Sequence, residues 1–141
     1  MSEVRATYRL QLGPDLTFAG ARALVPYLAE LGVSHLYLSP SFEAREGSTH
    51  GYDVIDARRL SDTLGGEEGF RALAAAAREA GLGLVLDVVP NHMAADDANP
   101  FWADEELRAR FFDVDPQTGF ARRFFDIDHL VGVRVEDPDV F

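Results

Sequence analysis

Segments with the pattern of short strands alternate with segments that have the pattern of helices over residues 4–89. Helices that return the chain to a neighbouring parallel strand cover the faces of a sheet, so this order predicts an α/β fold with a parallel sheet and right-handed crossovers. Periodicity alone leaves two architectures open, an open doubly wound sheet and the first part of a closed (β/α)8 barrel. A dinucleotide-binding sheet is disfavoured because no G-x-G-x-x-G motif follows the first strand segment.

Three segments have the pattern of strands. Residues 4–12 alternate with a period of two, and residues 34–39 form a short apolar run that stops at Pro40. Residues 82–89 are almost continuously apolar, which is typical of a strand buried on both faces. We therefore expect these three segments to form the sheet.

Two helices are predicted between these strands. Thr17 can cap a helix that ends at Gly32, since apolar residues recur between them at helical spacing. Glu67 stands at the start of the second helix, where a negative charge is favourable, and Gly81 closes it. The segment 41–66, rich in glycine, serine and charged residues, is predicted to be a long loop.

The last part of the chain has a different composition. Residues 1–93 hold 12 acidic residues and 8 arginines, a balance of −4, whereas residues 94–141 hold 12 acidic residues and 5 arginines, a balance of −7. We interpret residues 1–92 as a scaffold and residues 93–141 as a helix-and-hairpin excursion that follows the third strand.

Local signals within the excursion support this division. Asn99 and Pro100 have the pattern of a helix start, and the similar segments 111–115 and 124–128 flank the turn sequence PQTG, which predicts a β-hairpin. Asp137-Pro138 is another helix start, although Phe141 follows three residues later. We therefore expect the chain to need the rest of a larger domain.

Composition excludes several classes of partner. The chain has 13 Lys plus Arg, all of them Arg, against 24 Asp plus Glu, for a net charge of −11. This balance argues against binding of nucleic acid or an anionic membrane surface. Neither a membrane-spanning apolar run nor a signal core is visible, so we expect a cytoplasmic protein. With no cysteine, disulfides and thiolate metal sites are excluded.

Polar residues stand at the predicted carboxyl ends of the three strands, where ligands bind in α/β folds. They are Arg9 and Gln11 near the end of the first strand, His50, Tyr52 and Asp53 in the loop after the second, and Asp87, Asn91 and His92 at the end of the third. Asp87 is the most informative, because an ionised group within an apolar strand is costly unless it is paired. From its position, a structural role and a place in an active-site floor are equally favoured.

Each remaining candidate has a simpler interpretation. His92 can carry a proton or bind a sugar, and Tyr52 can stack on a sugar ring, but a single loop histidine or a packed tyrosine is the commoner case. Carboxylates and histidines do not cluster at metal-ligand spacing, so we expect no cofactor and no metal, with Asn91 a weak candidate for a calcium ligand. Six aromatic residues can line a carbohydrate groove or form the core of the excursion, and the core is favoured: Phe101, Trp102, Phe111, Phe112, Phe124 and Phe125.

Several motifs carry a family resemblance. DVVPNH at 87–92 and GYD at 51–53 resemble the first signature region and the second-strand loop of the α-amylase superfamily of (β/α)8 glycosidases and transglycosylases. Three further stretches resemble the malto-oligosyltrehalose synthases of this superfamily: TYRLQL at 7–12, HLYLSP with STHGYDV within 35–54, and RRFFDIDHLVGVRVEDPDVF at 122–141.

This resemblance implies the N-terminal portion of a (β/α)8 barrel, with residues 1–92 forming its first three strand–helix units. It also implies an isomerase that converts the reducing-end α-1,4 linkage of a maltodextrin to an α,α-1,1 linkage, a trehalosyl end, by retention. His92 and Tyr52 would line the subsite of the reacting sugar, with His50 beside them, while Asp53 and Asp87 would organise its floor. The nucleophile and the acid/base would follow the fourth and fifth strands, beyond Phe141, so the isolated chain is expected to be inactive.

One departure and three alternatives stay open. Only 29 residues (93–121) separate the third strand from the RRFFDI segment, where the family usually carries a long insertion. The alternatives are a fragment of an α-amylase-type maltodextrin hydrolase, a non-catalytic carbohydrate-binding or interaction module, and an unrelated open-sheet α/β domain.

Overall fold

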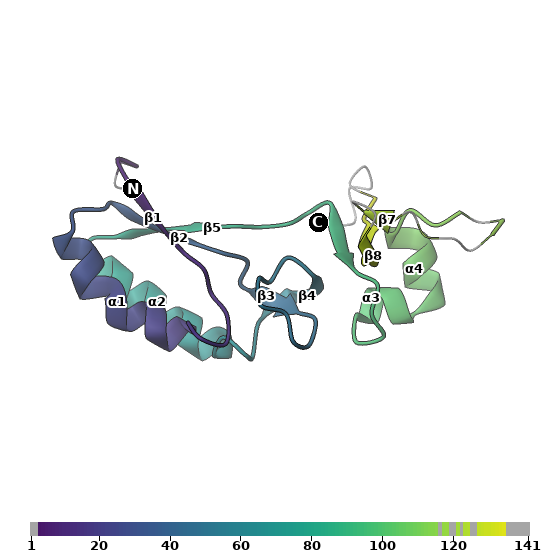
Figure 1. Ribbon diagram of the computed structural model, residues 1–141, viewed down its shortest axis with the longest axis horizontal. Helices are drawn as coiled ribbons and strands as arrows, with labels where there is room; N and C mark the ends of the chain where they lie inside the picture. Colours follow the sequence, from purple (N-terminus) through teal and green to yellow (C-terminus); the bar gives the residue numbers. More distant parts are fainter. Residues whose placement is uncertain (1–2, 116, 119–120, 122, 125–126, 135–141) are drawn as a thin grey trace.

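A computed structural model describes residues 3–115, 117–118, 121, 123–124 and 127–134. Two helices cover one face of a parallel sheet, and a hairpin lies between this layer and the excursion that follows (Figure 1). The α/β class with a parallel sheet, predicted from the alternation of strands and helices, is confirmed.

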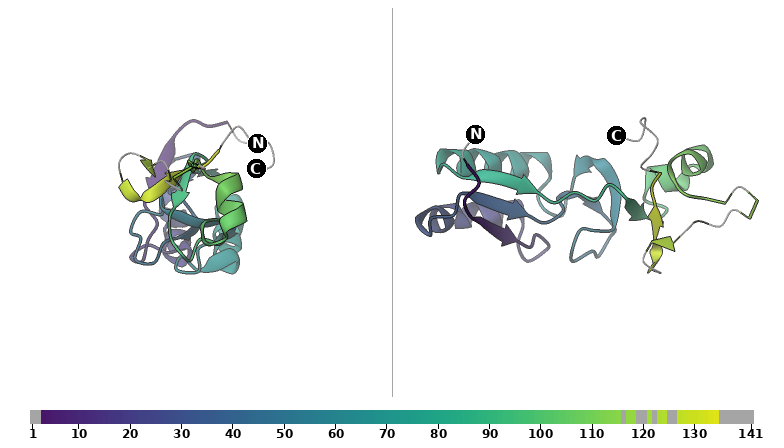
Figure 2. Two further views of the ribbon diagram at one scale, coloured as in Figure 1. Left: turned by 90° about the vertical axis from the view of Figure 1, so that its right-hand side faces the viewer. Right: turned by 90° about the horizontal axis from the view of Figure 1, so that it is seen from above.

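The parallel sheet contains β1 (Thr7–Leu10), β2 (His35–Leu38) and β5 (Gly83–Leu86), in the order β1-β2-β5. Leu10 is in register with Leu38, which is in register with Leu86. The three strands therefore end at one edge, and the residues that follow them are brought together there (Figure 2).

The two helices are α1 (Phe18–Glu30) and α2 (Gly66–Glu79). The Thr17 hydroxyl accepts a hydrogen bond from the Gly20 N–H, as expected of an N-cap, and Glu67 lies in the first turn of α2. Their apolar faces pack with β1 and β2 in a core of buried side chains: Leu10, Leu12, Phe18, Ala21, Val25, Leu28, Leu36, Leu38, Leu64, Leu73, Ala77 and Leu82.

The prediction of one long loop over residues 41–66 was wrong. The segment contains an antiparallel hairpin of β3 (Phe42–Ala44) and β4 (Val54–Leu60), with an irregular register. Val54 and Ile55 are buried, but charged residues flank them closely and hide the apolar signal of the strand. This hairpin fixes both ends of the loop that carries Tyr52.

The third strand is not buried on both faces as its composition predicted. Leu86 is 44% exposed, and Val88, just past the strand, is 56% exposed. Among the described strands β5 pairs with β2 alone, so it forms an edge of the sheet. Its continuous apolar pattern is that of a central strand with a neighbour on each edge. Among the described residues, only the edge beside β2 is paired.

The excursion forms a second sheet with two short helices. The sheet has the order β6-β8-β7 and contains β6 (His92–Ala94), β7 (Arg123–Phe124) and β8 (Ile127–Gly132); the helices are α3 (Pro100–Ala103) and α4 (Glu105–Phe111). Asn99 is fully buried and its side chain accepts hydrogen bonds from the first N–H groups of α3, as its sequence position indicated. The division of the chain at His92 stays a prediction.

The β-hairpin predicted around PQTG is supported by an antiparallel bridge between Val114 and Ala121, which flank this turn sequence. Within the described residues, Phe112 bridges Val133, Val114 bridges Ala121, and β7 pairs with β8. Phe112 pairs with Val133, just beyond the end of β8, whereas Phe124 pairs with Ile127 at its start, so the described residues of the similar FFDVD and FFDID sequences do not pair with each other. The helix start predicted at Asp137-Pro138 lies outside the described residues.

Aromatic side chains form a small core within the excursion. Phe101 meets Phe111 and Trp102 meets Phe112 in edge-to-face contacts, with ring centroids 5.5 and 5.3 Å apart, and Phe112 is fully buried. These contacts are those of a small core, and Phe101, Phe111 and Phe112 also line an apolar cavity beside the β3–β4 hairpin. The side chains of Phe124 and Phe125 lie outside the described residues. Within the described part of the chain, the structure contains no helix with the length and apolar character needed to cross a membrane.

Candidate functional site

The polar residues predicted to follow the strands meet around Asp87, directly after β5. The Tyr52 hydroxyl, from the β3–β4 loop, donates a hydrogen bond of 2.6 Å to Asp87 Oδ2. The Tyr37 hydroxyl donates to the same oxygen over 3.0 Å. Sequence reasoning missed Tyr37, although its place between the buried Leu36 and Leu38 of β2 puts it on the opposite face of the strand.

Arg9 joins the same network from the end of β1. One of its guanidinium nitrogens donates to the Tyr52 hydroxyl (3.1 Å) and the other to Gln11 Oε1 (2.8 Å), while the group lies 5.6 Å from the centroid of the Tyr37 ring. The hydrogen bond to Tyr52 raises the pKa of Arg9. Donation to Asp87 is the main cause that raises the pKa of Tyr52, so the phenol stays protonated at neutral pH.

His92 is buried against the loop that carries Tyr52. Its Nε2 lies 3.1 Å from the Tyr52 carbonyl oxygen, to which it donates, and its Nδ1 lies 3.0 Å from Asn91 Oδ1. Burial lowers the pKa of His92, and the hydrogen bond to Tyr52 and the charge of Asp53 act in the opposite direction. The imidazole is therefore neutral at pH 7 and holds the backbone of Tyr52 in place.

A decrease in pH is expected to destabilise the chain through His92. The unfolded chain takes up this proton near a pKa of 6.5, whereas the folded chain resists it. The stability contributed by neutral His92 is thus present above that pH and is lost as the pH falls toward the lower folded-state pKa. Thermal unfolding at about pH 7.5 and about pH 5 measures the loss, which should be smaller in His92→Gln. If His92→Gln loses as much stability as the wild type, the assignment to His92 is wrong.

Asp53 and His50 shape the loop around Tyr52. Asp53 is only 5% exposed, and its carboxylate accepts a hydrogen bond from the Ser48 hydroxyl. His50 is exposed; its Nδ1 accepts a hydrogen bond from the Tyr52 N–H over 3.0 Å, and its ring stacks on the Tyr52 ring with centroids 5.9 Å apart. The structure thus brings His50, Tyr52 and Asp53 together in one loop, as the sequence indicated.

Asn91 is exposed, and its described side-chain contact is with His92. Among the residues that the structure describes, no group of three or more His, Asp or Glu side chains is arranged to hold a metal ion. The geometry gives Asn91 a place beside His92, and its weak candidacy as a calcium ligand stays a prediction.

Gly51 allows the loop to turn beside Pro40. Its φ is +77°, and a Cβ placed there would lie 2.9 Å from the Pro40 carbonyl oxygen. Gly51→Ala is therefore expected to lower the free energy of unfolding by about 1–3 kcal/mol in urea denaturation. Gly47→Ala is the matched control, since Gly47 has a φ of +78° but open space around it. Equal losses in the two variants would show that the contact with Pro40 is unimportant.

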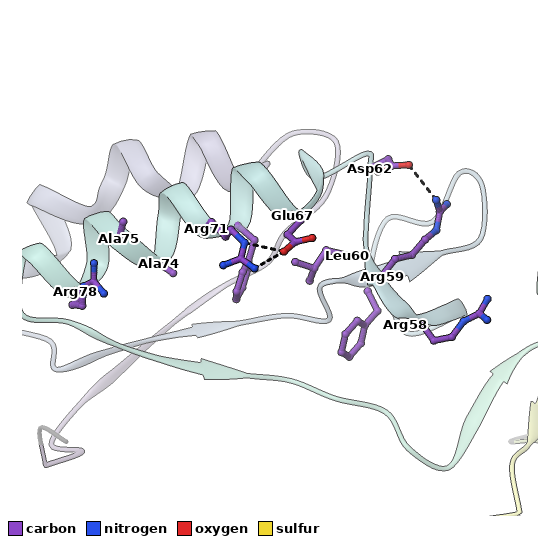
Figure 3. Close-up of a pocket in the computed structure, with 11 residues that line it drawn as sticks. Arg58, Arg59, Leu60, Asp62, Glu67, Arg71, Ala74, Ala75 and Arg78 are labelled. Carbon is purple, nitrogen blue, oxygen red and sulfur yellow. Dashed lines mark hydrogen bonds and ion pairs between the residues drawn. The ribbon is translucent and has the colours of Figure 1, made fainter. Parts of the chain in front are cut away.

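Two cavities of the structure are lined by side chains outside this network. One, of about 900 Å³, lies between α2 and the β3–β4 hairpin (Figure 3). Its lining includes Arg58, Arg59, Arg71 and Arg78, of which Arg71 is paired with Glu67 and Arg59 with Asp62. The other, of about 570 Å³, is mostly apolar and lies between the hairpin and the excursion. Tyr37, Tyr52, Asp87 and His92 line neither cavity, although Val88 and Val89, which follow Asp87, line the second.

Comparisons with known proteins agree with the motifs. Residues 16–119 match the alpha amylase catalytic domain family. A putative maltooligosyl trehalose synthase of Mycobacterium tuberculosis is 46% identical over 132 residues, which cover 84% of this chain and 17% of that protein. A 1,4-alpha-glucan branching enzyme of Photobacterium profundum is 34% identical over 113 residues, covering 79% of this chain and 16% of the enzyme. The chain thus spans less than a fifth of the length of these relatives.

Solved structures show the same fold. The maltooligosyltrehalose synthase from Arthrobacter ramosus superposes with a TM-score of 0.88 at 32% identity, over 96% of this chain and 28% of that one. A second maltooligosyl trehalose synthase gives a TM-score of 0.90 at 30% identity, over 99% of this chain and 29% of that one. The resemblance to these synthases is therefore confirmed, and the described elements correspond to the N-terminal part of an amylase-type barrel. Since the family match covers more than half of its residues, the chain belongs to the alpha amylase catalytic domain family.

Proposed function

We propose that this chain supplies one wall of the sugar-binding site of an intramolecular transglycosylase, a (1→4)-α-D-glucan 1-α-D-glucosylmutase. The substrate is a maltodextrin and the product carries a terminal α,α-1,1 trehalosyl unit. The observation that carries the proposal is the network in which Tyr52 donates to Asp87 while His92 holds the Tyr52 backbone. The similarity to maltooligosyl trehalose synthases supports the choice of reaction.

The network suits sugar binding better than bond cleavage. The Tyr52 ring, fixed at its hydroxyl, offers a flat face to the apolar side of a glucose ring. His92 uses its Nε2 proton on Tyr52, so donation to a sugar hydroxyl requires that it exchange this partner. Asp87 already accepts two phenol hydroxyls on one oxygen, which favours a positioning role over that of a nucleophile.

Retaining transfer needs a carboxylate nucleophile and a carboxylic acid about 5–5.5 Å apart. We assign neither role to a residue of this chain, and both groups are taken to come from the later part of the barrel. Attack by a sugar hydroxyl in place of water then gives rearrangement without hydrolysis. The isolated chain is accordingly proposed to be inactive, with the remainder of the barrel as the partner it needs.

The reaction can be tested by a graft. This chain replaces the matched stretch of the M. tuberculosis relative, and the chimera is incubated with maltopentaose. Loss of reducing ends and formation of a non-reducing oligosaccharide are expected, whereas release of glucose and maltose would indicate a hydrolase. The unmodified relative shows that the assay works, and the isolated chain should show no turnover.

Binding of maltopentaose to the isolated chain distinguishes the proposed transglycosylase from a non-catalytic carbohydrate-binding module. Weak binding of maltopentaose, seen as NMR shift changes at Tyr52 and His92, is expected from one wall of a site. Tight binding with quenching of Trp102 fluorescence would favour a carbohydrate-binding module that uses the excursion. Turnover by the isolated chain at the rate of the grafted enzyme would contradict the proposed division of roles.

A further inference from the structure

Arg9 and Gln11 belong to the TYRLQL motif, but the proposed function gives them no task. Both side chains are exposed at the end of β1, beside the loop that carries Tyr52. Gln11 Oε1 accepts from Arg9, and Gln11 Nε2 lies 3.3 Å from the Leu12 carbonyl oxygen and 3.5 Å from that of His50. Gln11 therefore links β1 to the loop and holds the guanidinium of Arg9 in a defined direction.

The second guanidinium nitrogen of Arg9 completes the hydrogen bonding of Tyr52. The Tyr52 hydroxyl donates to Asp87 and accepts from Arg9, so the phenol is held from two strands, β5 and β1. A phenol held by one partner can still swing about that bond, whereas two partners in different directions fix the plane of the ring. Stacking on a sugar depends on that plane, since the face of the ring must be parallel to the sugar.

From this geometry we propose that Arg9, held by Gln11, is a positioning residue that fixes the Tyr52 ring for stacking on the bound glucose. The inference rests on the proposed sugar site, because it gives Tyr52 its stacking role. Arg9 acts through Tyr52 and makes no contact of its own with the described Asp87 carboxylate. Its two terminal nitrogens donate to Gln11 and Tyr52 separately, a geometry that the single nitrogen of a lysine does not reproduce.

The pKa of the Tyr52 phenol gives a direct measure of its contact with Arg9. The chain is labelled with 13C-tyrosine, its Tyr52 signal is assigned by Tyr52→Phe, and the pKa of the phenol is measured by NMR. Asp87 raises this pKa and Arg9 lowers it, so Arg9→Met should raise it further. Arg9→Lys should restore part of the difference, because it keeps the charge but loses the fork. Arg5→Met, which removes an exposed arginine before the same strand, should leave the pKa unchanged.

Maltopentaose binding is then measured on the same variants. Arg9→Met is expected to weaken binding by about 3- to 10-fold, the size of one net hydrogen bond, with Arg9→Lys in between and Arg5→Met as the wild type. Unchanged binding in Arg9→Met, or an unchanged pKa of Tyr52 with a lower melting temperature, would overturn the proposal. If the wild type itself does not bind, the proposed function fails, and the pKa of Tyr52 still reports whether Arg9 holds the ring.

Discussion

Phe18→Ala is expected to lower the free energy of unfolding by about 3–5 kcal/mol, because it leaves a large cavity in the core. Phe18 is fully buried at the start of α1, and its ring meets Phe70 of α2 edge-to-face with centroids 5.5 Å apart. The Phe18 backbone N–H donates to the Leu64 carbonyl oxygen, which holds the start of α1 in place, so we expect the cavity left by the substitution to stay open. Urea denaturation followed by circular dichroism measures the effect.

Tyr27→Ala on the same helix is the matched control. Tyr27 is 60% exposed, so its removal should change the free energy of unfolding by no more than about 0.5 kcal/mol. If Phe18→Ala costs as little as Tyr27→Ala, then α1 and α2 are not packed as described. That result would also mean that α1 and α2 do not hold the parallel sheet whose carboxyl edge forms the site.

Asp87→Asn is expected to lower kcat/KM of the grafted enzyme by about 10- to 100-fold, since a hydrogen bond to a charged group contributes about 1.5–3 kcal/mol. The carboxylate receives the hydroxyls of Tyr52 and Tyr37 on one oxygen, and the amide keeps the shape but not the charge. The pKa of Tyr52 should fall in the same variant, because Asp87 is the main cause of its increase.

The two measurements on Asp87→Asn distinguish a site residue from a structural one. Asp97→Asn changes an exposed carboxylate of the excursion and should leave both kcat/KM and the pKa of Tyr52 as they are. A fall in the pKa of Tyr52 with full activity would mean that the network has no part in the reaction. Loss of activity with an unchanged pKa would mean that Tyr52 and Asp87 do not interact in solution.

The site could be predicted from the sequence because the site residues stand at the ends of strands that local patterns identify. Asp87 and Tyr52 lie 35 residues apart, yet both stand at the carboxyl edge of the sheet and meet there. Tyr37 was missed because a tyrosine within an apolar strand is usually a packing residue. Its alternation with Leu36 and Leu38 was the available signal.

The errors concern elements whose structure depends on distant partners. The β3–β4 hairpin pairs three residues with a strand that charged residues interrupt, so no run of apolar residues marks it. The pairing of the excursion depends on β8, which joins β6 from the start of the excursion to β7 beside it. Local repeats such as FFDVD and FFDID carry no information on which of several strands will be adjacent.

The exposed edge of β5 has a consequence for synthesis. While a chain is still on the ribosome, an apolar strand with one open side can pair with unrelated strands, and this risk lasts until a neighbour covers it. Asp87 interrupts the exposed apolar run between Leu86 and Val88, and a charge in such a position opposes aggregation. We therefore expect the charge of Asp87 to limit aggregation of this edge in addition to accepting the hydrogen bond from Tyr52.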